Sequence, residues 1–482
     1  MSNINDYWKN YIDNQWVDGN SERLSVENPA TGEHLAWQAM ADKSDVAQAV
    51  IAANACHDSG VLSAMRPVER GRLVRQMGEW LLDHVEEIAN ILCYEQGKQL
   101  WEAKNEATNC ARYYEYYGNQ AETLEGKSIP LGQNYLDFTS YEPYGVSAQI
   151  IPWNFPLEIS ARSIAAGIAT ANACVVKSPE LAPLSSQYLA RAAEAVGLPR
   201  GALNILCGLG NEAGAALSEH ADVNQIVFTG SLATGIQIAA AAAQNIVPCV
   251  LELGGKSAAI VSSDADLDNF IKSLRAGIFT NSGQVCSAMS RAIVHEDIHD
   301  EVVERAADLA QSISVGPGIE RTQPGLNMGA MISKNQRDRA EAICKRAGRD
   351  GARIVTGGHR LNHHGSFLQP TIIDNVNPDS ELGQTEVFGP VISIMKYQNE
   401  NQAIEIANGT QYGLVGGVFT RDLDRAMNVA RKFRAGQVFV NEWFAGGVET
   451  PFGGYGKSGY GREKGREALF NYVQTKNIAI RL

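Results

Sequence analysis

The sequence predicts a mixed α/β fold built on two parallel sheets, and three observations support this fold class. A chain of 482 residues is too long for one hydrophobic core, since domains average about 150 residues. Short apolar strands alternate with helical stretches between residues 145 and 255, and the same alternation recurs from residue 257 to about residue 450. Such alternation is typical of a parallel sheet with helices on both faces.

The predicted elements follow in chain order. Residues 45–117 carry apolar side chains at helical spacing, which predicts several long amphipathic helices. Two strand-like stretches, 135–141 and 470–482, lie outside the alternating regions, and their edges could pair in an oligomer. The first alternating region has predicted strands at 146–151, 173–177, 202–206, 225–229 and 249–253, and the second at 258–261, 291–294, 371–374, 391–397 and 437–441.

The composition disfavours several classes of protein. Apolar residues make up 44% of the chain and charged residues 20%, which is ordinary for a globular protein. The formal net charge of -13 disfavours nucleic acid and anionic membranes as partners. The sequence shows no signal peptide, and no apolar run approaches the ~18 residues of a membrane span. The eight cysteines are dispersed without metal-ligand spacing, so we expect reduced thiols, a cytoplasmic location and no metal.

Residues 281–288 read N-S-G-Q-V-C-S-A and place Cys286 on a loop behind a Ser-Gly pair. A thiol on such a loop is reachable and held in place, as a nucleophile requires. The alternative is a buried structural cysteine, which behaves as a small hydrophobic residue. The motif alone favours this inert alternative, because reactivity depends on a lowered thiol pKa.

Residues at the carboxyl ends of two predicted strands form a candidate nucleotide site. Gly230 and Ser231 precede an alanine-rich helix, and a helix N-terminus reached through glycine can bind a pyrophosphate. The glycine spacing is G-x-x-x-x-G rather than G-x-G-x-x-G, so a plain strand-turn-helix is an equal alternative. Lys177 and Glu180 could share the hydroxyls of a ribose, or form only a surface ion pair.

Two further residues suit catalysis. Glu252 lies between leucines in L-E-L-G-G-K, an apolar setting that raises a carboxyl pKa toward the range of a general base. Its alternative role is a buried, hydrogen-bonded carboxylate. Asn154 lies between two prolines in P-W-N-F-P, and a rigid amide is a good donor to a developing oxyanion. Its alternative role is to form a turn.

Seven motifs occur in order along the chain: P-W-N-F-P, V-V-K-S-P-E, F-T-G-S, L-E-L-G-G-K, N-S-G-Q-V-C, E-V-F-G-P and P-F-G-G-Y-G-K-S-G-Y-G-R-E. Together they resemble the NAD(P)-dependent aldehyde dehydrogenase superfamily. The resemblance implies a Rossmann-like cofactor domain (1–122 and 143–253), a second α/β catalytic domain (254–451) and a small β oligomerisation element (123–142 and 469–482). It also implies a homodimer or homotetramer.

The resemblance implies NAD-dependent oxidation of an aldehyde to its carboxylic acid. Cys286 would attack the aldehyde to give a thiohemiacetal and would later carry the thioester. Asn154 and the backbone N–H of Cys286 would hold the oxyanion. Glu252 would activate the water that hydrolyses the thioester, and Glu463 matches a second glutamate that some members use near a proton path.

The resemblance also implies the cofactor contacts. A carboxylate at Glu180 would repel a 2'-phosphate, which favours NAD over NADP. Many members read K-P-x-E where this chain reads K-S-P-E, so NADP stays open as an alternative. Glu386 and Phe388 match the residues that hold the nicotinamide ribose and ring. The full set of implied cofactor-binding residues is Ile151, Pro152, Trp153, Lys177, Glu180, Gly230, Ser231, Glu386 and Phe388.

Departures from the family pattern bear on the proton path and the substrate. Ser163 stands where many members carry a lysine proposed for proton relay. Arg162 occupies an often aromatic position in the substrate tunnel, which suggests a polar aldehyde or a semialdehyde, with an exposed, solvated arginine as the alternative. Family members that act on semialdehydes pair this arginine with a second cation, but this chain has Thr280 at that position, six residues before Cys286. Gly446 replaces a bulky aromatic residue of the tunnel, which suggests a wide tunnel mouth. The implied substrate contacts are Arg162, Phe155, Val285, Ser287 and Phe452.

Three alternative functions stay open from the sequence. A CoA-acylating dehydrogenase would release its thioester to a thiol, and the presence of Glu252 argues against it. A binding or structural protein that keeps the fold without turnover would not need Cys286, Glu252 and Asn154 together. A thiol esterase would use the same nucleophile without a nucleotide.

Overall fold

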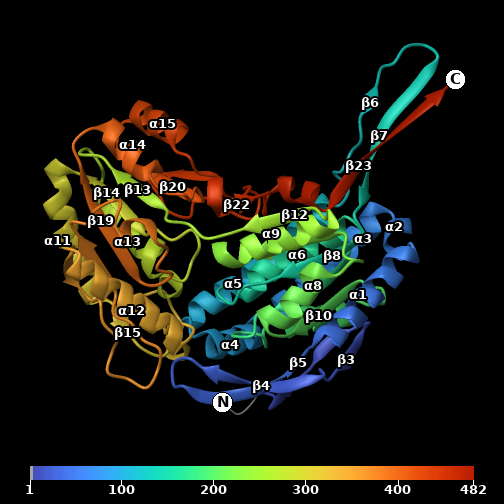
Figure 1. The fold of residues 1–482 in the computed structure, drawn as a ribbon, viewed down its shortest axis with the longest axis horizontal. Coiled ribbons are helices and arrows are strands. Elements are labelled where there is room, and N and C mark those ends of the chain that lie inside the picture. The colour runs from blue at the N-terminus through green and yellow to red at the C-terminus, as the bar shows by residue number, and fades with distance from the viewer. Residues whose placement is uncertain (1–3) are drawn as a thin grey trace.

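The computed structural model describes residues 4–482 and confirms the mixed α/β fold. Figure 1 shows two α/β halves side by side, with a long β arm that projects from one of them. The first half carries most of the N-terminal part of the chain, and the second half carries most of the C-terminal part. No helix within residues 4–482 is both long enough and apolar enough to cross a membrane.

The first half contains an eight-stranded sheet in the order β22-β12-β11-β8-β9-β10-β2-β3. The five central strands are parallel, and all five were predicted to within one residue at each end. They are β8 (Val146–Ile150), β9 (Ala173–Ser178), β10 (Leu203–Cys207), β11 (Gln225–Thr229) and β12 (Cys249–Glu252). The antiparallel edge strands are β2 (Asn10–Ile12), β3 (Gln15–Val17) and β22 (Gly459–Tyr460).

The strand order reverses beside β8, because the next strand in the chain, β9, lies on one side of it and β11 lies on the other. Connections on either side of such a reversal leave a crevice at the carboxyl ends of the strands, where ligands bind in open α/β sheets. Residues that follow β8 and β11 therefore line a ready-made binding site.

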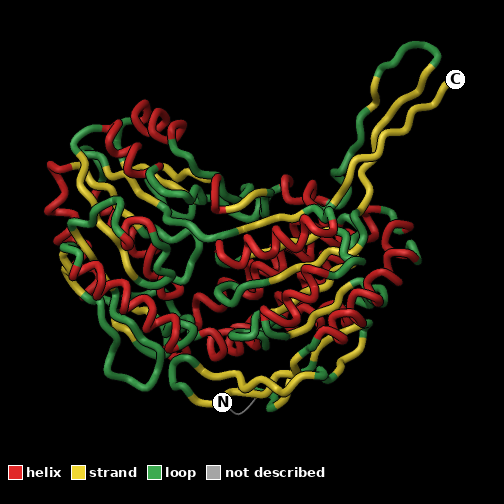
Figure 2. Tube along the Cα trace, in the orientation of Figure 1, coloured by secondary structure: helices red, strands yellow, loops and turns green. Residues whose placement is uncertain are grey.

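Helices cover both faces of this sheet (Figures 1 and 2). The predicted helical region 45–117 forms the first group of helices, and α5 packs against α3, α4 and α6. Three tyrosines of α5 are fully buried in the core, as helical spacing suggests. The helices are α1 (Lys43–Asp58), α3 (Pro67–Asp83), α4 (Val85–Gln96), α5 (Leu100–Gln120), α6 (Pro156–Ala169), α7 (Gln187–Ala195), α8 (Ala215–Glu219) and α9 (Leu232–Asn245).

The second half contains a seven-stranded sheet in the order β17-β18-β19-β14-β13-β20-β21, in which only β17 is antiparallel. The strands are β13 (Ala258–Val261), β14 (Arg291–His295), β17 (Arg353–Thr356), β18 (Thr371–Asp374), β19 (Val391–Tyr397), β20 (Val415–Phe419) and β21 (Gln437–Val440). The helices around it include α10 (Leu267–Leu274), α11 (His299–Ser312), α12 (Lys334–Arg349), α14 (Glu400–Asn408) and α15 (Leu423–Lys432).

Two strands of the second sheet were not predicted. The residues of β20 read V-G-G-V-F, and glycine normally weakens a strand. Here a Cβ at Gly416 would meet the Phe433 ring at 2.4 Å, and one at Gly417 would meet Trp443 at 2.7 Å. The two glycines therefore let aromatic rings pack directly against the strand. The other missed strand, β17, is half exposed at the sheet edge.

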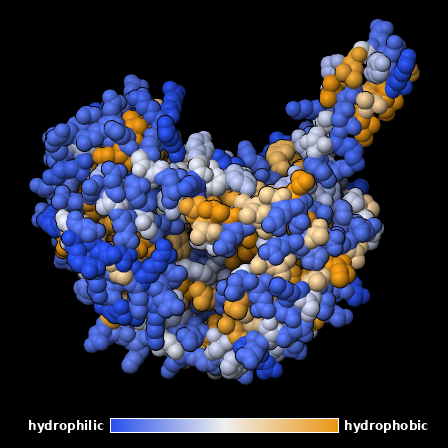
Figure 3. All heavy atoms as spheres, viewed as in Figure 1, coloured by the Kyte–Doolittle hydropathy of each residue, from blue (hydrophilic) through white to orange (hydrophobic). Residues whose placement is uncertain are grey.

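The projecting arm consists of β6 (Ser128–Ile129), β7 (Tyr135–Pro143) and β23 (Val473–Arg481), paired in the order β23-β7-β6 (Figure 2). The two strand-like stretches predicted outside the main regions thus pair with each other. Figure 3 shows apolar side chains on the arm, and Leu136, Ile478 and Ile480 are among its exposed residues. A separate N-terminal sheet joins β1 (Tyr7–Trp8), β5 (Glu33–Met40) and β4 (Ser21–Asn28).

Candidate active site

Two cavities meet at Cys286. One, of about 470 Å³, extends from the crevice where the strand order of the first sheet reverses, beside Ser231 at the N-terminus of α9, to the thiol. The other, of about 360 Å³, approaches the same thiol from the opposite side and is lined by Arg162 and Phe452. Asn154 also borders both cavities. A group in the first cavity and a small molecule in the second could therefore both contact the Cys286 side chain.

The loop that carries Cys286 has an unusual backbone. Asn281 and Ser282 both adopt left-handed φ angles, of 48° and 54°, which cost free energy in residues with a side chain. Gly283 follows at φ 72°, and a Cβ there would lie 2.2 Å from the carbonyl oxygen of Gly389. The Ser282 hydroxyl donates to the carbonyl oxygen of Gly329 at 2.9 Å. These contacts hold the thiol loop against the second half of the molecule.

The surroundings of the Cys286 thiol favour its protonated form. Burial raises the pKa of the thiol to about 12, and the positive charge of Arg162 only partly opposes this shift. Cys286 is half-buried and lines both cavities, so it differs from a cysteine that only fills the core. A reaction at this sulfur therefore needs a nearby group that accepts the thiol proton.

Glu252 ends β12 and is 2% exposed. Neither of its carboxylate oxygens has a hydrogen-bond partner among residues 4–482. Burial and the negative charge of Glu463 raise the pKa of Glu252 well above its usual range, and Arg162 opposes them. This direction agrees with the apolar setting expected from the sequence, and no side chain or backbone group within residues 4–482 supplies the hydrogen bond of the alternative role.

Glu463 is the neighbouring carboxylate whose charge acts on Glu252, and two side chains of α6 bind it. The Arg162 guanidinium forms a buried ion pair with it, and the Ser163 hydroxyl donates to it at 3.1 Å. Its own backbone pairs with Phe452 in both directions, at 2.6 and 2.7 Å. Arg162 is 7% exposed, and its guanidinium carbon lies 5.7 Å from the Phe452 ring centroid. The alternative of an exposed, solvated arginine is therefore wrong.

Asn154 follows β8 in the short turn before α6 and is 4% exposed. Its side-chain amide donates to the carbonyl oxygen of Gln284, at 3.0 Å, two residues before Cys286. An amide has two N–H groups, so one donor remains beyond this bond, and Asn154 and Cys286 line the same two cavities. The predicted oxyanion donor and the predicted nucleophile are thus brought together by the fold.

The residues predicted to contact a cofactor lie along the first cavity or beside it. Ser231 caps α9 by accepting from the backbone N–H of Thr234 at 3.3 Å. The Phe388 ring meets Trp153 edge-on, with centroids 5.3 Å apart, and forms one wall of the cavity. Glu386 accepts from the backbone N–H of Gly255 at 3.1 Å, and burial raises its pKa to about 7.

Lys177 and Glu180 form an ion pair of 2.5 Å at the end of β9. The Lys177 side chain is only 4% exposed, so the pair is not a plain surface contact. Gly230 and Pro152 line the cavity, whereas Lys177, Glu180 and Ile151 stand outside its lining. Gln336 and Arg339 also line it and were not predicted.

The first cavity fits a dinucleotide. The N-terminus of α9 offers free backbone N–H groups to a pyrophosphate, and Gly230 lets the chain turn closely, since a Cβ there would meet the Phe228 ring at 2.5 Å. Trp153, Phe388 and Glu386 line the same cavity as this helix end and the thiol. A nucleotide bound along this path would reach Cys286.

All five predicted substrate contacts line the second cavity, as do Thr280 and Gly446. One cation there was missed, namely Lys464. Its backbone has a φ of 59°, and it forms no ion pair with any residue from 4 to 482. Burial lowers the pKa of its ammonium group. The position follows the G-R-E motif, and its left-handed backbone gave no signal in the sequence. Within residues 4–482 there is no cluster that could hold a metal ion.

A switch-point crevice and a second cavity that share one thiol are typical of enzymes that bring a bound nucleotide to a small substrate. Residues 16–478 match the model of the aldehyde dehydrogenase family. The chain therefore belongs to this family, as the sequence motifs predicted, and it is an aldehyde-oxidising enzyme.

Relatives of known name support this assignment. The chain is 39% identical to the mitochondrial aldehyde dehydrogenase family 2 member B4 of Arabidopsis thaliana, over 98% of this chain and 88% of that protein. It is 38% identical to an aldehyde dehydrogenase of Emericella nidulans, over 98% of this chain and 95% of that protein. The solved NAD+ complex of an aldehyde dehydrogenase from Bacillus cereus is 35% identical and superimposes with a TM-score of 0.96, covering 99% of this chain and 97% of that one.

Proposed function

We propose that this enzyme oxidises a polar aldehyde to its carboxylic acid with NAD, through a thioester on Cys286. The observation that carries the proposal is the meeting of Cys286, Asn154 and an unpartnered Glu252 carboxylate near the junction of the two cavities. Cofactor and substrate would approach this junction from opposite sides. The NAD+ complex of the related Bacillus cereus enzyme supports the choice of cofactor.

The first chemical step requires a thiolate. Glu252 has a raised pKa and no hydrogen bond to lose, so it is suited to accept the proton of the buried Cys286 thiol. The sulfur then forms a bond to the aldehyde carbon, and the carbonyl oxygen takes up the electron pair of the C=O π bond. The free N–H of Asn154 and the backbone N–H of Cys286 donate to this oxyanion.

The oxidation step converts the thiohemiacetal into a thioester. NAD, when bound, supplies the acceptor for the hydrogen and electron pair that leave the substrate carbon. Ser231 and Gly230 would hold its pyrophosphate, Lys177 and Glu180 its adenosine ribose, and Glu386 and Phe388 its nicotinamide end. The remaining implied contacts, Ile151, Pro152 and Trp153, follow β8 at the same edge. Glu180 disfavours a 2'-phosphate, so NADP would bind less tightly.

Hydrolysis regenerates the thiol. Glu252 removes a proton from water, the hydroxyl oxygen attacks the thioester carbon, and the C–S bond breaks to release the acid. The Cys286 sulfur takes a proton as it leaves. Glu463, with Arg162 and Ser163 as its partners, would pass on the proton that Glu252 has accepted.

The second cavity supports a polar substrate, including a semialdehyde. The charge of Arg162 is engaged by Glu463, so Arg162 offers only part of its positive potential to a ligand. Lys464 lines the same cavity without an ion-pair partner in the described chain and would attract a substrate carboxylate. Gly446, at φ 99°, leaves the mouth of the cavity open.

Three further expectations from the sequence stay proposals. The expected domain boundaries would assign the cofactor site to residues 1–122 and 143–253 and the thiol to residues 254–451. The β23 and β7 arm exposes apolar side chains, which supports pairing with a second copy in a homodimer or homotetramer. A cytoplasmic location is expected from the cysteine usage, and all eight cysteines are free.

The function is tested with aliphatic, aromatic, hydroxylated and carboxylated aldehydes, each supplied with NAD and with NADP while NADH or NADPH absorbance is followed. We expect Cys286→Ala to abolish turnover, whereas the matched control Cys249→Ala, at another half-buried cysteine, keeps it. Turnover in Cys286→Ala would refute the nucleophile. Faster turnover with added CoA would instead indicate a CoA-acylating enzyme, and the absence of any NAD(P)H would indicate a binding protein.

A further inference from the structure

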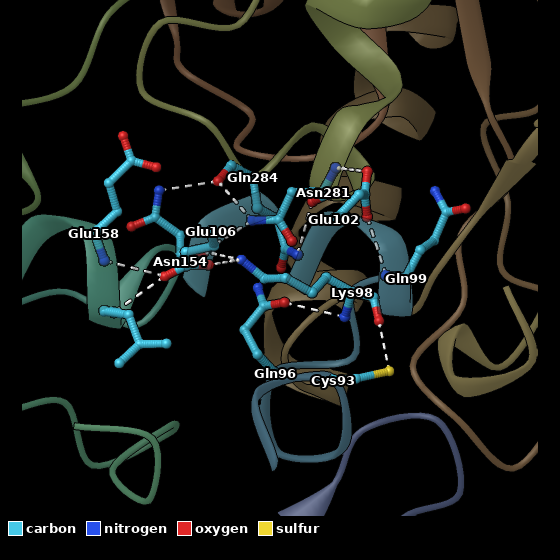
Figure 4. Close-up of polar contacts among 11 residues, drawn as sticks. Cys93, Gln96, Lys98, Gln99, Glu102, Glu106, Asn154, Glu158, Asn281 and Gln284 are labelled. Atoms are coloured by element: carbon cyan, nitrogen blue, oxygen red, sulfur yellow. Dashed lines mark hydrogen bonds and ion pairs between the residues drawn. The ribbon is translucent and has the colours of Figure 1, made fainter. Parts of the chain in front are cut away.

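A buried ion pair contacts the backbone of the proposed oxyanion donor (Figure 4). Lys98 lies in the turn between α4 and α5, and Glu106 lies on α5. Their side chains are 0% and 1% exposed, and the ammonium and carboxylate are in direct contact. Burial of two charges seldom stabilises a fold more than well-packed apolar residues would. The pair therefore calls for an explanation beyond stability.

The Lys98 ammonium group also holds the backbone of Asn154. Its Nζ donates to the main-chain carbonyl oxygen of Asn154 at 3.0 Å. The side-chain amide of Asn281 donates to the same oxygen, also at 3.0 Å. The carbonyl group of Asn154 is thus fixed from two segments that lie far apart in the sequence.

Glu106 holds the segment that follows Asn154. One of its carboxylate oxygens accepts from the backbone N–H groups of Leu157 and Glu158, at 3.0 and 3.4 Å. These are free N–H groups in the first turn of α6, whose own N-cap residue, Phe155, offers no side-chain acceptor. A carboxylate at a helix N-terminus is also favoured by the helix dipole. Glu106 therefore replaces the missing cap and fixes where α6 begins.

Glu102 lies one helical turn before Glu106 on α5 and holds the other side of the site. Its carboxylate accepts from the backbone N–H of Asn281 at 2.9 Å, where the thiol loop adopts its left-handed conformation. The second carboxylate oxygen accepts from the backbone N–H of Gln99 at 3.0 Å. Residues four apart lie on one face of a helix. One face of α5 thus contacts both the loop of the nucleophile and the loop of the oxyanion donor.

We propose that Lys98, Glu102 and Glu106 are positioning residues that set the Asn154 amide at the correct distance from Cys286. This inference rests on the proposed roles of those two residues. An oxyanion donor is effective only when it lies about 2.7–3.1 Å from the developing charge. A misplacement of about 1 Å can cost roughly a hundred-fold in rate. The charged pair fixes Asn154 through its backbone and leaves one side-chain N–H free for the substrate.

The test is a double-mutant cycle on the rapid burst of NADH formation, with Lys98→Met, Asn154→Ala and the combination of both. We expect Lys98→Met to slow the burst by about ten- to hundred-fold while the NAD dissociation constant stays unchanged. In the Asn154→Ala background the same change should slow the burst by less than about two-fold, because the donor that Lys98 positions is gone. Equal losses in both backgrounds would overturn the proposal.

Stability and burial need their own controls. The variant Lys98→Met/Glu106→Gln removes both charges and keeps the shape of the pair, so it avoids an isolated buried charge. It should fold, judged by circular dichroism, and show the same slow burst; a normal burst would overturn the proposal. Glu95→Gln is the matched control, because Glu95 is also fully buried and accepts two backbone N–H groups, from Leu184 and Ser185. It should lower the melting temperature without slowing the burst, and a slowed burst would overturn the proposal.

The cycle also separates this inference from the proposed function. A normal burst in Asn154→Ala would refute the oxyanion role and the inference together. A different outcome is a slow burst in Asn154→Ala that Lys98→Met slows further by the same factor as in the wild type. That result would leave the oxyanion role intact and refute only the positioning role.

Discussion

The charge of Glu463 should set the pH at which the proposed base works. Glu463 raises the pKa of Glu252, and Arg162, its ion-pair partner, lowers it. Replacing Glu463 with Gln removes a negative charge and leaves Arg162 uncompensated. Both carboxyl groups are almost fully buried, where charges are screened much less than in water. A change of about 1.4 kcal/mol in the interaction with a neighbouring charge moves a pKa by one unit.

The sign of the change follows from the role of the base. Thioester hydrolysis needs ionised Glu252, so its rate rises with pH as that carboxyl loses its proton. Glu463→Gln lowers the pKa of Glu252, so the acid limb of the hydrolysis rate should move to lower pH. Arg162→Met should move the same limb to higher pH. Ser163→Ala removes a hydrogen bond from Glu463 but no charge, and should leave the limb in place.

The assay measures steady-state turnover across pH under conditions where hydrolysis limits the rate, with the NADH burst recorded separately. The burst reports the steps up to hydride transfer, so it separates an effect on the proposed thiol deprotonation from an effect on hydrolysis. A shift in the same direction for Glu463→Gln and Arg162→Met would refute the electrostatic coupling of this cluster to Glu252. An unmoved acid limb in Glu463→Gln would refute it as well.

Three further outcomes are expected. Glu252→Gln should slow both the burst of NADH and the release of the acid by roughly a hundred-fold or more, since Glu252 is the proposed base for the thiol and for water; a burst at the wild-type rate would refute its role as acceptor of the thiol proton. Lys464→Met should raise KM for carboxylated aldehydes several-fold more than for neutral ones, and an equal effect on both would remove the argument for an anionic substrate. Burial opposes the ionisation of Glu341, but hydrogen bonds from Arg360 and Lys345 outweigh it and lower its pKa to about 2, so Glu341→Gln should lower Tm at neutral pH, by about 2 °C. The wild-type advantage should be complete above about pH 4.5 and disappear as the pH falls through about 2, and an advantage that persisted in stronger acid would contradict this assignment.

Regular periodicity explains what the sequence could predict. The helices of residues 45–117 and the five central strands of the first sheet have strong apolar patterns, and both were found. Three of the seven motifs pointed to Asn154, Glu252 and Cys286 because the residues that define each motif are adjacent in the sequence. The strand β20 escaped prediction because its two glycines make room for aromatic rings that come from elsewhere in the chain.

The direction of a side chain depends on contacts that local sequence does not contain. Arg162 was expected either in the substrate tunnel or in solvent. It lines the second cavity, but its guanidinium also pairs with Glu463, 301 positions away in the chain, which the local sequence does not indicate. Lys98 and Glu106 were not singled out at all, although Glu106 is a charged residue on the buried face of an amphipathic helix. A charged residue at a buried helical position was the available signal, because such burial needs a partner.

The strand β22 pairs with the edge of β12, where Gly459 lies opposite Glu252, and the short segment after it supplies Glu463. A growing chain leaves the ribosome N-terminus first, so the sheet of the first half and the thiol loop emerge long before these residues do. During synthesis the edge of β12 is therefore open, and an open edge strand can pair with other chains. The segment that supplies the proposed proton path would also close this edge, so a chain stalled before residue 459 should be both inactive and prone to aggregate.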